Sequence, residues 1–215
     1  MFSLFVAIVS SQPLSRLITF MYQIDQSFVE RLICDGCDAW TIELWSKWLG
    51  LSREFNSSLA AIAEAFSNVK LGDGIGMLEA DGIDNYVGPE DRASRRERDE
   101  RRRWQSISST ELNANYCSFW FCDAKGGLFL LPAFLLADLR DEYDFNFVGS
   151  VVRCITVRRC TPLPAWIDKL NEKQRSALCN VFELLKFHPD FHSRQDKLST
   201  VVASISNPKR TECAG

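Results

Sequence analysis

The stretch FWFCDAKGGLFLLPAFLLADL, residues 119–139, concentrates aromatic and aliphatic side chains and decides how the core is built. Residues 116–122 are rich in aromatics, and residues 128–131 are apolar. The residues between them, 123–127, end in two glycines that can adopt positive φ. This pattern is typical of a β-hairpin, and arms that are apolar on both faces belong inside a fold. We therefore expect a buried hairpin over about residues 116–131, ended by Pro132.

Apolar residues on both sides of this hairpin recur at three- and four-residue spacing, which indicates helices. The clearest helix begins at Asn171, where Gln174 stands three residues on in a capping-box arrangement. Residues 151–157 favour a third strand because of their β-branched side chains, with a short helix as the alternative. The sequence thus predicts an α+β fold, mainly helical, with a small antiparallel sheet built on the central hairpin.

Length and composition set the domain organisation. The chain has 215 residues, of which 46% are hydrophobic, enough for a core that needs neither disulfides nor metal. We expect a helical N-terminal extension (1–53), an α+β core domain (54–190) and a polar C-terminal tail (191–215). The net charge of −3 argues against a general nucleic-acid binder. No apolar stretch approaches the ~18 residues of a membrane span.

The cysteines and the start of the chain bear on its location. Eight cysteines suggest a disulfide framework only in a small secreted chain, and this chain is not small. Its apolar run, residues 2–9, is preceded by no Lys or Arg and followed by no cleavage-like site. We therefore expect a cytoplasmic protein with reduced thiols.

Three segments together resemble a bacterial family of proteins of unknown function: GIGMLEADGID (74–84), the stretch at 119–139, and LNEKQRSALCNVFELL (170–185). The pattern of that family is a Leu-x-Glu-Ala segment with a nearby Asp, a Trp matched by Trp104, a hairpin running into Leu-Pro-Ala-aromatic, and a helix that starts with Gln. The order and spacing agree over about residues 54–187. The resemblance implies a small α+β domain and brings no activity, substrate or catalytic residue with it.

Glu79, Asp81 and Asp84 are the carboxylates most suggestive of a metal site or of acid–base chemistry. Asp81 and Asp84 are three residues apart and would share a helix face. The simpler interpretation is that they cap a helix and complement its dipole. His188 and His192 are four apart but straddle Pro189, which weakens a zinc-pair interpretation.

Cys34 and Cys37 form the one cysteine pair at redox or metal spacing. A redox pair needs a thiolate of low pKa at a helix N-terminus, and a thioredoxin-like site would follow a strand, which is not indicated here. The alternative is that both are structural cysteines, which commonly behave as small buried hydrophobes.

Two surfaces could contact a partner. Residues 90–103 carry seven arginines and five acids, and i,i+4 pairs such as Asp91–Arg95 predict a solvent-facing, self-paired helix. From it, Arg95, Arg98 and Arg102 are candidate interaction residues. Trp45 and Trp48 would share a helical face in the N-terminal extension, and tryptophan is enriched in interface hot spots.

The function predicted first is a non-enzymatic protein-interaction or regulatory module, including an immunity-type partner of another bacterial protein. No cofactor, specific nucleic acid or membrane is predicted as a ligand, and the sequence does not indicate an oligomeric state. The first alternative is a metal-dependent enzyme that uses Glu79, Asp81 and Asp84. The second alternative is a thiol redox protein that uses Cys34 and Cys37.

Overall fold

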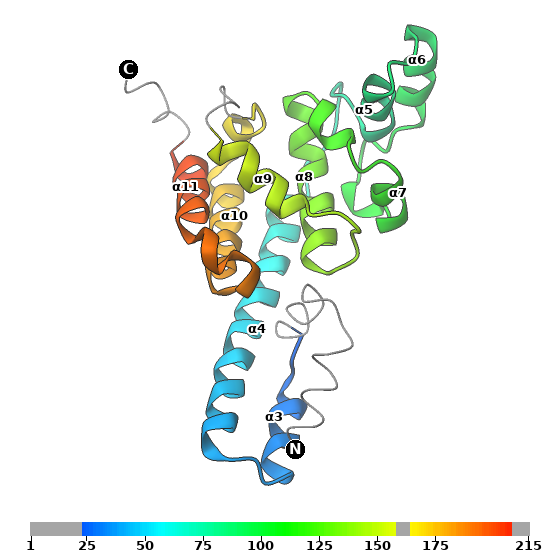
Figure 1. Ribbon diagram of the computed structural model, residues 1–215. Helices are drawn as coiled ribbons and strands as arrows, with labels where there is room; N and C mark the ends of the chain where they lie inside the picture. Colours follow the sequence, from blue (N-terminus) through cyan, green and yellow to red (C-terminus); the bar gives the residue numbers. More distant parts are fainter. Residues whose placement is uncertain (1–22, 158–163, 208–215) are drawn as a thin grey trace.

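The computed structural model describes residues 23–157 and 164–207, and within these ranges the chain contains helices but no strand (Figure 1). The α-helices are α3 (Gln26–Cys34), α4 (Ala39–Ala65), α5 (Met77–Asp84), α6 (Pro89–Arg98), α7 (Ser109–Ala114), α8 (Ala124–Leu139), α9 (Phe147–Thr156), α10 (Glu172–Leu184) and α11 (Gln195–Ser206). The short 3₁₀-helices are η1 (Trp104–Ser106), η2 (Ser118–Phe121), η3 (Ile167–Lys169), η4 (Leu185–Phe187) and η5 (Pro189–Arg194). Across these residues, no helix is both long and apolar enough to cross a bilayer.

The predicted α+β fold is wrong, because the stretch at 119–139 forms η2 and α8 and not a hairpin. Asp123 caps α8: its Oδ1 accepts a hydrogen bond from the Gly126 amide at 2.7 Å. The two glycines therefore lie in the first turn of a helix. Eleven of the sixteen residues of α8 are buried, so the helix is apolar all round. Periodicity cannot separate such a helix from a buried strand.

Gly126 and Gly127 do not form a turn; they allow other segments to pack closely against α8. A Cβ on Gly126 would overlap the carbonyl oxygen of Ile75, which precedes α5. A Cβ on Gly127 would lie 2.9 Å from Cδ1 of Trp166. The absence of a side chain at both positions thus lets α8 approach two other segments of the chain.

The predicted third strand is also wrong, and the short-helix alternative for this segment is correct. Residues 147–156 form α9, whose N-cap Asn146 accepts a hydrogen bond from the Gly149 amide at 2.6 Å. Val151, Val152 and Ile155 are buried on one face of α9. Their burial in the core outweighs the preference of β-branched residues for strands.

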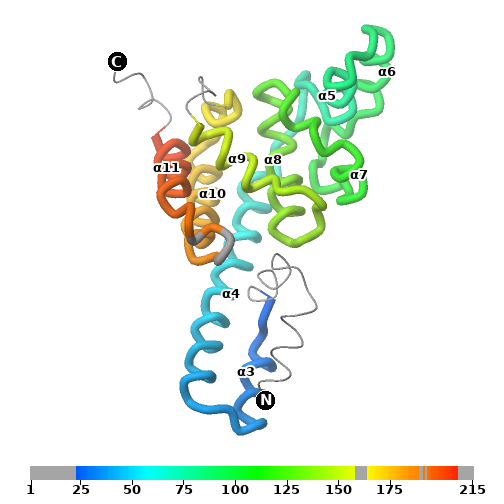
Figure 2. The backbone as a smooth tube through the Cα atoms, viewed as in Figure 1, coloured from blue at the N-terminus to red at the C-terminus, as the bar shows by residue number. Residues whose placement is uncertain are grey.

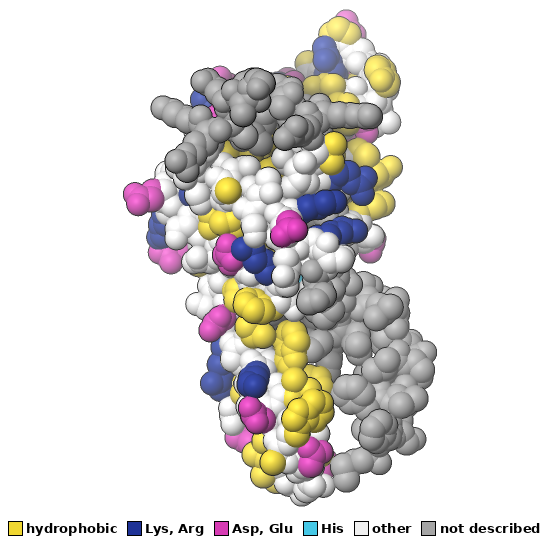
Figure 3. All heavy atoms as spheres, turned by 60° about the vertical axis from the view of Figure 1, so that its left-hand side comes forward, with side chains coloured by type: hydrophobic (Ala, Val, Ile, Leu, Met, Phe, Trp, Pro, Cys, Tyr) yellow, Lys and Arg dark blue, Asp and Glu magenta, His cyan; other side chains and the backbone are white. Residues whose placement is uncertain are grey.

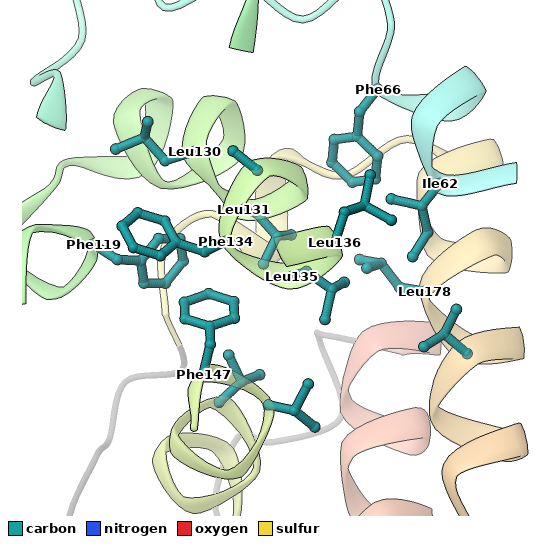
Figure 4. Packing of buried hydrophobic residues seen from close by; sticks show 14 of the residues in the cluster. Ile62, Phe66, Phe119, Leu130, Leu131, Phe134, Leu135, Leu136, Phe147 and Leu178 are labelled. Carbon is teal, nitrogen blue, oxygen red and sulfur yellow. The ribbon is translucent and has the colours of Figure 1, made fainter. Parts of the chain in front are cut away.

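The core surrounds α8, with side chains from α4, α9, α10 and α11 packed against it (Figure 4). Phe134 on α8 has no exposed surface, and it stacks on Phe147 of α9 with ring centroids 5.3 Å apart. Phe134 also meets Tyr143 edge to face at 5.5 Å. This aromatic contact joins α8 to α9 and to the loop between them, residues 140–146.

The helix α4 is continuous from Ala39 to Ala65. Its C-terminal half enters the core, whereas its N-terminal half and α3 extend away from the body (Figure 2). This projecting hairpin has a small cluster of its own: Ile24, Val29, Trp45 and Leu49. Hydrophobic side chains line it in Figure 3. The predicted domain boundary at residues 53 and 54 falls within α4.

The C-terminal helices follow local signals. Asn171 and Gln174 form the predicted capping box at the start of α10, with the two amide-to-side-chain bonds at 2.9 and 3.0 Å. Beyond residue 191, where a polar tail is predicted, α11 places Leu198, Val201 and Ile205 in the core. The segment up to Ser206 is thus part of the packed body.

Candidate functional site

The predicted carboxylate site is a contact between α5 and α6. Asp81 Oδ2 lies 2.5 Å from Arg95 Nη1, and Glu79 Oε2 lies 2.6 Å from Arg96 Nη1. Arg95 thus pairs across to α5 and not with Asp91 as predicted. Among the described residues, no three His, Cys, Asp or Glu side chains gather in a way that could hold a metal ion. Both carboxylates hold α6 against α5, and Asp84, the last residue of α5, is not part of these two ion pairs.

Asp99, the C-cap residue of α6, is a structural carboxylate. Its oxygens accept hydrogen bonds from the Leu78 amide at 2.7 Å and the Glu79 amide at 3.3 Å, at the start of α5. Burial raises the pKa of Asp99, against these amides, which lower it. The carboxyl therefore acts as a distant N-cap for α5.

The other two arginines predicted to contact a partner are exposed to solvent. Arg98 and Arg102 are exposed, and the Nε of Arg98 reaches the Ser94 carbonyl in its own helix at 3.4 Å. The next arginine, Arg101, donates to the carbonyls of Gly72 and Gly74. Much of the arginine-rich segment thus fastens α6 and the following loop to the body.

The two cysteines of the predicted redox pair flank the turn between α3 and α4. Cys34 is the last residue of α3 and is exposed, whereas Cys37 is half-buried just before Asp38, the N-cap of α4. Cys34 therefore does not lie at the helix N-terminus that a redox pair needs.

The two predicted interaction tryptophans lie inside the projecting hairpin. Trp45 is buried and meets Phe28 edge to face at 4.9 Å. Trp48 is half-buried between the two hydrophobic clusters. Trp40, by contrast, is 71% exposed. The α3–α4 contact thus uses Trp45 as a core residue.

A cleft of about 650 Å³, which the sequence analysis misses, lies between α4, the α8–α9 loop and the η4–η5 segment. Its lining includes Asp138, Tyr143, His188 and Arg194. Burial lowers the pKa of His188 to about 4 and raises that of Tyr143. The side chain of His192, the other predicted histidine, is outside the described residues.

Asp138, near the end of α8, is the ionisable group that shapes this cleft. Its Oδ2 accepts a hydrogen bond from the Val148 amide at 2.7 Å, in the first turn of α9. Burial raises the pKa of Asp138 to about 6, although the amides of Val148 and Phe147 lower it. The carboxyl links the two helices that enclose the loop.

Three exposed aromatic rings, which we call the aromatic patch, come from two segments: Tyr116 and Trp120 from the segment that follows α7, and Phe145 from the α8–α9 loop. Their exposed fractions are 48%, 40% and 43%. The rings of Tyr116 and Phe145 are stacked with their centroids 4.2 Å apart, and the ring centroids of Trp120 and buried Phe147 are 6.1 Å apart. The ring centroids of Phe145 and Tyr143 are 5.5 Å apart, so the patch is continuous with the core.

Hydrogen bonds hold the loop under the patch in one conformation. Asn113 of α7 donates to the Glu142 carbonyl at 3.2 Å and accepts from the Asp144 amide at 2.8 Å. The Tyr143 hydroxyl donates to the Tyr116 carbonyl at 3.0 Å. Asp141, at φ 59°, closes α8 with a left-handed C-terminal residue. No sequence motif marks this arrangement, because its partners lie some 30 residues apart.

A family model described as "Family of unknown function (DUF6714)" matches residues 55–205. The chain belongs to this family. The DUF6714 match covers α8, the cleft and the aromatic patch, and it leaves out α3 and the first part of α4. Neither the curated proteins nor the solved structures include a match to this chain. The prediction of a family of unknown function is therefore confirmed, whereas its motif pattern and its bacterial origin stay predictions.

Within the DUF6714 domain, Asp138→Asn is expected to change how stability depends on pH. The folded pKa of about 6 lies above the ordinary 3.8, so this carboxyl favours the folded state below pH 3.8 and loses that contribution as the pH rises through 6. Asparagine keeps an oxygen for the Val148 amide and does not titrate. Relative to wild type, the variant should gain up to about 3 kcal/mol of unfolding free energy between pH 4 and 7.

Urea denaturation at several pH values measures this difference. Because the variant and the wild type share His188, its own loss of stability between pH 6.5 and 4 cancels in the comparison. Asp168→Asn, at an exposed position, serves as the control and should run parallel to wild type. A parallel profile for Asp138→Asn would contradict the role of buried Asp138.

Proposed function

We propose that this chain is a non-enzymatic module that binds another protein through the aromatic patch, in regulation or as an immunity-type partner. The observation that carries the proposal is the stacked pair Tyr116 and Phe145, exposed yet fixed by the hydrogen bonds of the loop beneath it. The proposal retains the cytoplasmic location predicted from the sequence. It assigns the contact surface to the aromatic patch and not, as predicted from the sequence, to Trp45, Trp48 and the arginine-rich segment.

Two physical features of the patch support this proposal. Tyrosine and tryptophan offer large contact areas and are enriched among the residues that dominate interface energies. Side chains already held in place lose little conformational entropy on binding, so more of the contact energy appears as affinity. Trp120 and Phe145 contact rings of the core, and Tyr116 stacks on Phe145, so the three rings form a preorganised binding surface.

The metal-enzyme and redox alternatives receive no such support. Glu79 and Asp81 pair with arginine guanidinium groups, and Cys34 lies at the C-terminal end of α3, not at the helix N-terminus that a redox pair needs. We therefore put forward the binding module alone.

Capture from a native lysate tests the proposal with three immobilised proteins: wild type, the double variant Tyr116→Ser/Phe145→Ser, and Phe187→Ser. Phe187 is 61% exposed and lies outside the patch, so its variant controls for general stickiness. We expect a protein that is retained by wild type and by Phe187→Ser and is reduced about tenfold or more on the double variant. Equal retention by all three proteins, or no specific retention, would contradict the proposal. Circular dichroism checks that the double variant is folded.

A further inference from the structure

We propose that the aromatic patch recognises an arginine-bearing, positively charged segment of its partner protein. This inference rests on the proposed function and adds the chemistry of the partner. The observation behind it is that the loop carrying Phe145, which stacks on Tyr116, also carries three exposed carboxylates.

The charge around the patch is strongly one-sided. Residues 111–147 contain six acids and two bases, a net charge of −4. Asp141, Glu142 and Asp144 are exposed on the loop that carries Phe145. Of the two bases, Lys125 is engaged in an ion pair with Asp73, and Arg140 is exposed beside Asp141, so the loop itself carries three exposed acids against one exposed base. A cationic partner would therefore meet an excess of negative charge.

The rings themselves add a site for a cation. Tyr116 and Phe145 are nearly parallel, at 15°, so each ring covers one face of the other and nearly half of each side chain stays exposed. A guanidinium lying over an aromatic face within about 6 Å gains roughly 0.5–1 kcal/mol at an exposed site. Arginine stacks on rings and can also form paired hydrogen bonds to a carboxylate, which lysine cannot do. Rings beside carboxylates thus favour arginine.

A second copy of this chain is the competing occupant, since Arg98 and Arg102 are exposed. Arg95, Arg96 and Arg101 of the same segment are engaged within the chain, whereas Arg103 is exposed as well. The chain as a whole carries a net charge of −3, so a second copy would bring more negative than positive charge to this surface, and a separate basic partner is favoured.

Fluorescence anisotropy with a labelled short peptide that alternates arginine and tyrosine tests the chemistry on the full chain. The comparison peptide carries citrulline in place of arginine, which keeps the shape of the side chain and removes its charge. We expect the arginine peptide to bind about tenfold or more tightly than the citrulline peptide, and its binding to weaken as salt is raised. Equal binding of both peptides, or no binding of the arginine peptide, would overturn the inference.

Two variants separate the contribution of the carboxylate charges to peptide binding from that of the aromatic rings. Glu142→Gln/Asp144→Asn removes two charges, and since these residues bond Asn113 through backbone atoms the loop should keep its conformation. Tyr116→Ala removes one ring, while its carbonyl still accepts from Tyr143. We expect each variant to bind the arginine peptide about threefold or more weakly, with Asp168→Asn unchanged. An undiminished affinity in the charge variant would refute the acidic role.

The same variants distinguish this inference from the function on which it rests. The informative result is a lysate partner that is lost with Tyr116→Ser/Phe145→Ser but binds Glu142→Gln/Asp144→Asn as well as it binds wild type. That result would support the proposed interaction module and contradict the inference that its partner is basic. Analytical ultracentrifugation at high protein concentration tests whether a second copy of the chain binds to the patch. Self-association that disappears with the charge variant would assign the patch to a second copy and overturn the proposal.

Discussion

Phe134→Ala is expected to lower the free energy of unfolding by about 3–5 kcal/mol, the range for removing a buried aromatic ring from a core. Phe134 has no exposed surface and holds together three segments through its contacts with Phe147, Tyr143 and Phe119 (Figure 4). Those contacts position the loop below the aromatic patch. Urea denaturation followed by circular dichroism measures the loss.

The matched control is Phe187→Ala, which removes the same ring from a position that is 61% exposed. A surface change of this kind usually alters stability by about 0.5 kcal/mol or less. Similar losses for the two variants would mean that α8 is not the centre of the core. A Phe134→Ala protein that does not fold would still agree with the expectation, provided that Phe187→Ala folds normally.

Gly126→Ala is expected to destabilise the protein by about 1–3 kcal/mol or more, the usual cost of overpacking a tight contact. The added methyl group would overlap the Ile75 carbonyl and approach Cys122 Cβ to 3.0 Å. Backbone cannot rotate away as a flexible side chain can, so α8 and the segment before α5 must separate. Thermal and urea denaturation measure the change.

Gly50→Ala makes the same chemical change inside α4, where a Cβ would meet no atom within 4 Å. Alanine is favoured over glycine in a helix interior by roughly 0.5–1 kcal/mol, so this variant should be more stable than wild type. The two substitutions thus have opposite expected signs for a physical reason that lies only in their surroundings. A stabilising effect of Gly126→Ala would rule out the close approach of α8 to Ile75.

The amino-acid sequence specifies the local features of the fold. Asn171 and Gln174 specify the start of α10, and Pro89 specifies the start of α6, because caps and first-turn prolines act within a few residues. The pattern of segments also led to a family of unknown function, which the match over residues 55–205 bears out.

Tertiary structure alone decided the rest. The stretch 119–139 is apolar on every side, so whether it becomes a hairpin or a helix depends on the neighbours that bury it, among them Ile75 and Trp166. The carboxylates of Glu79 and Asp81 became ion pairs because α6 folds back on α5. The aromatic patch joins Tyr116 to Phe145 through contacts between distant segments. Such contacts leave no periodic trace in the chain, since side-chain spacing reports only which face of one element is buried.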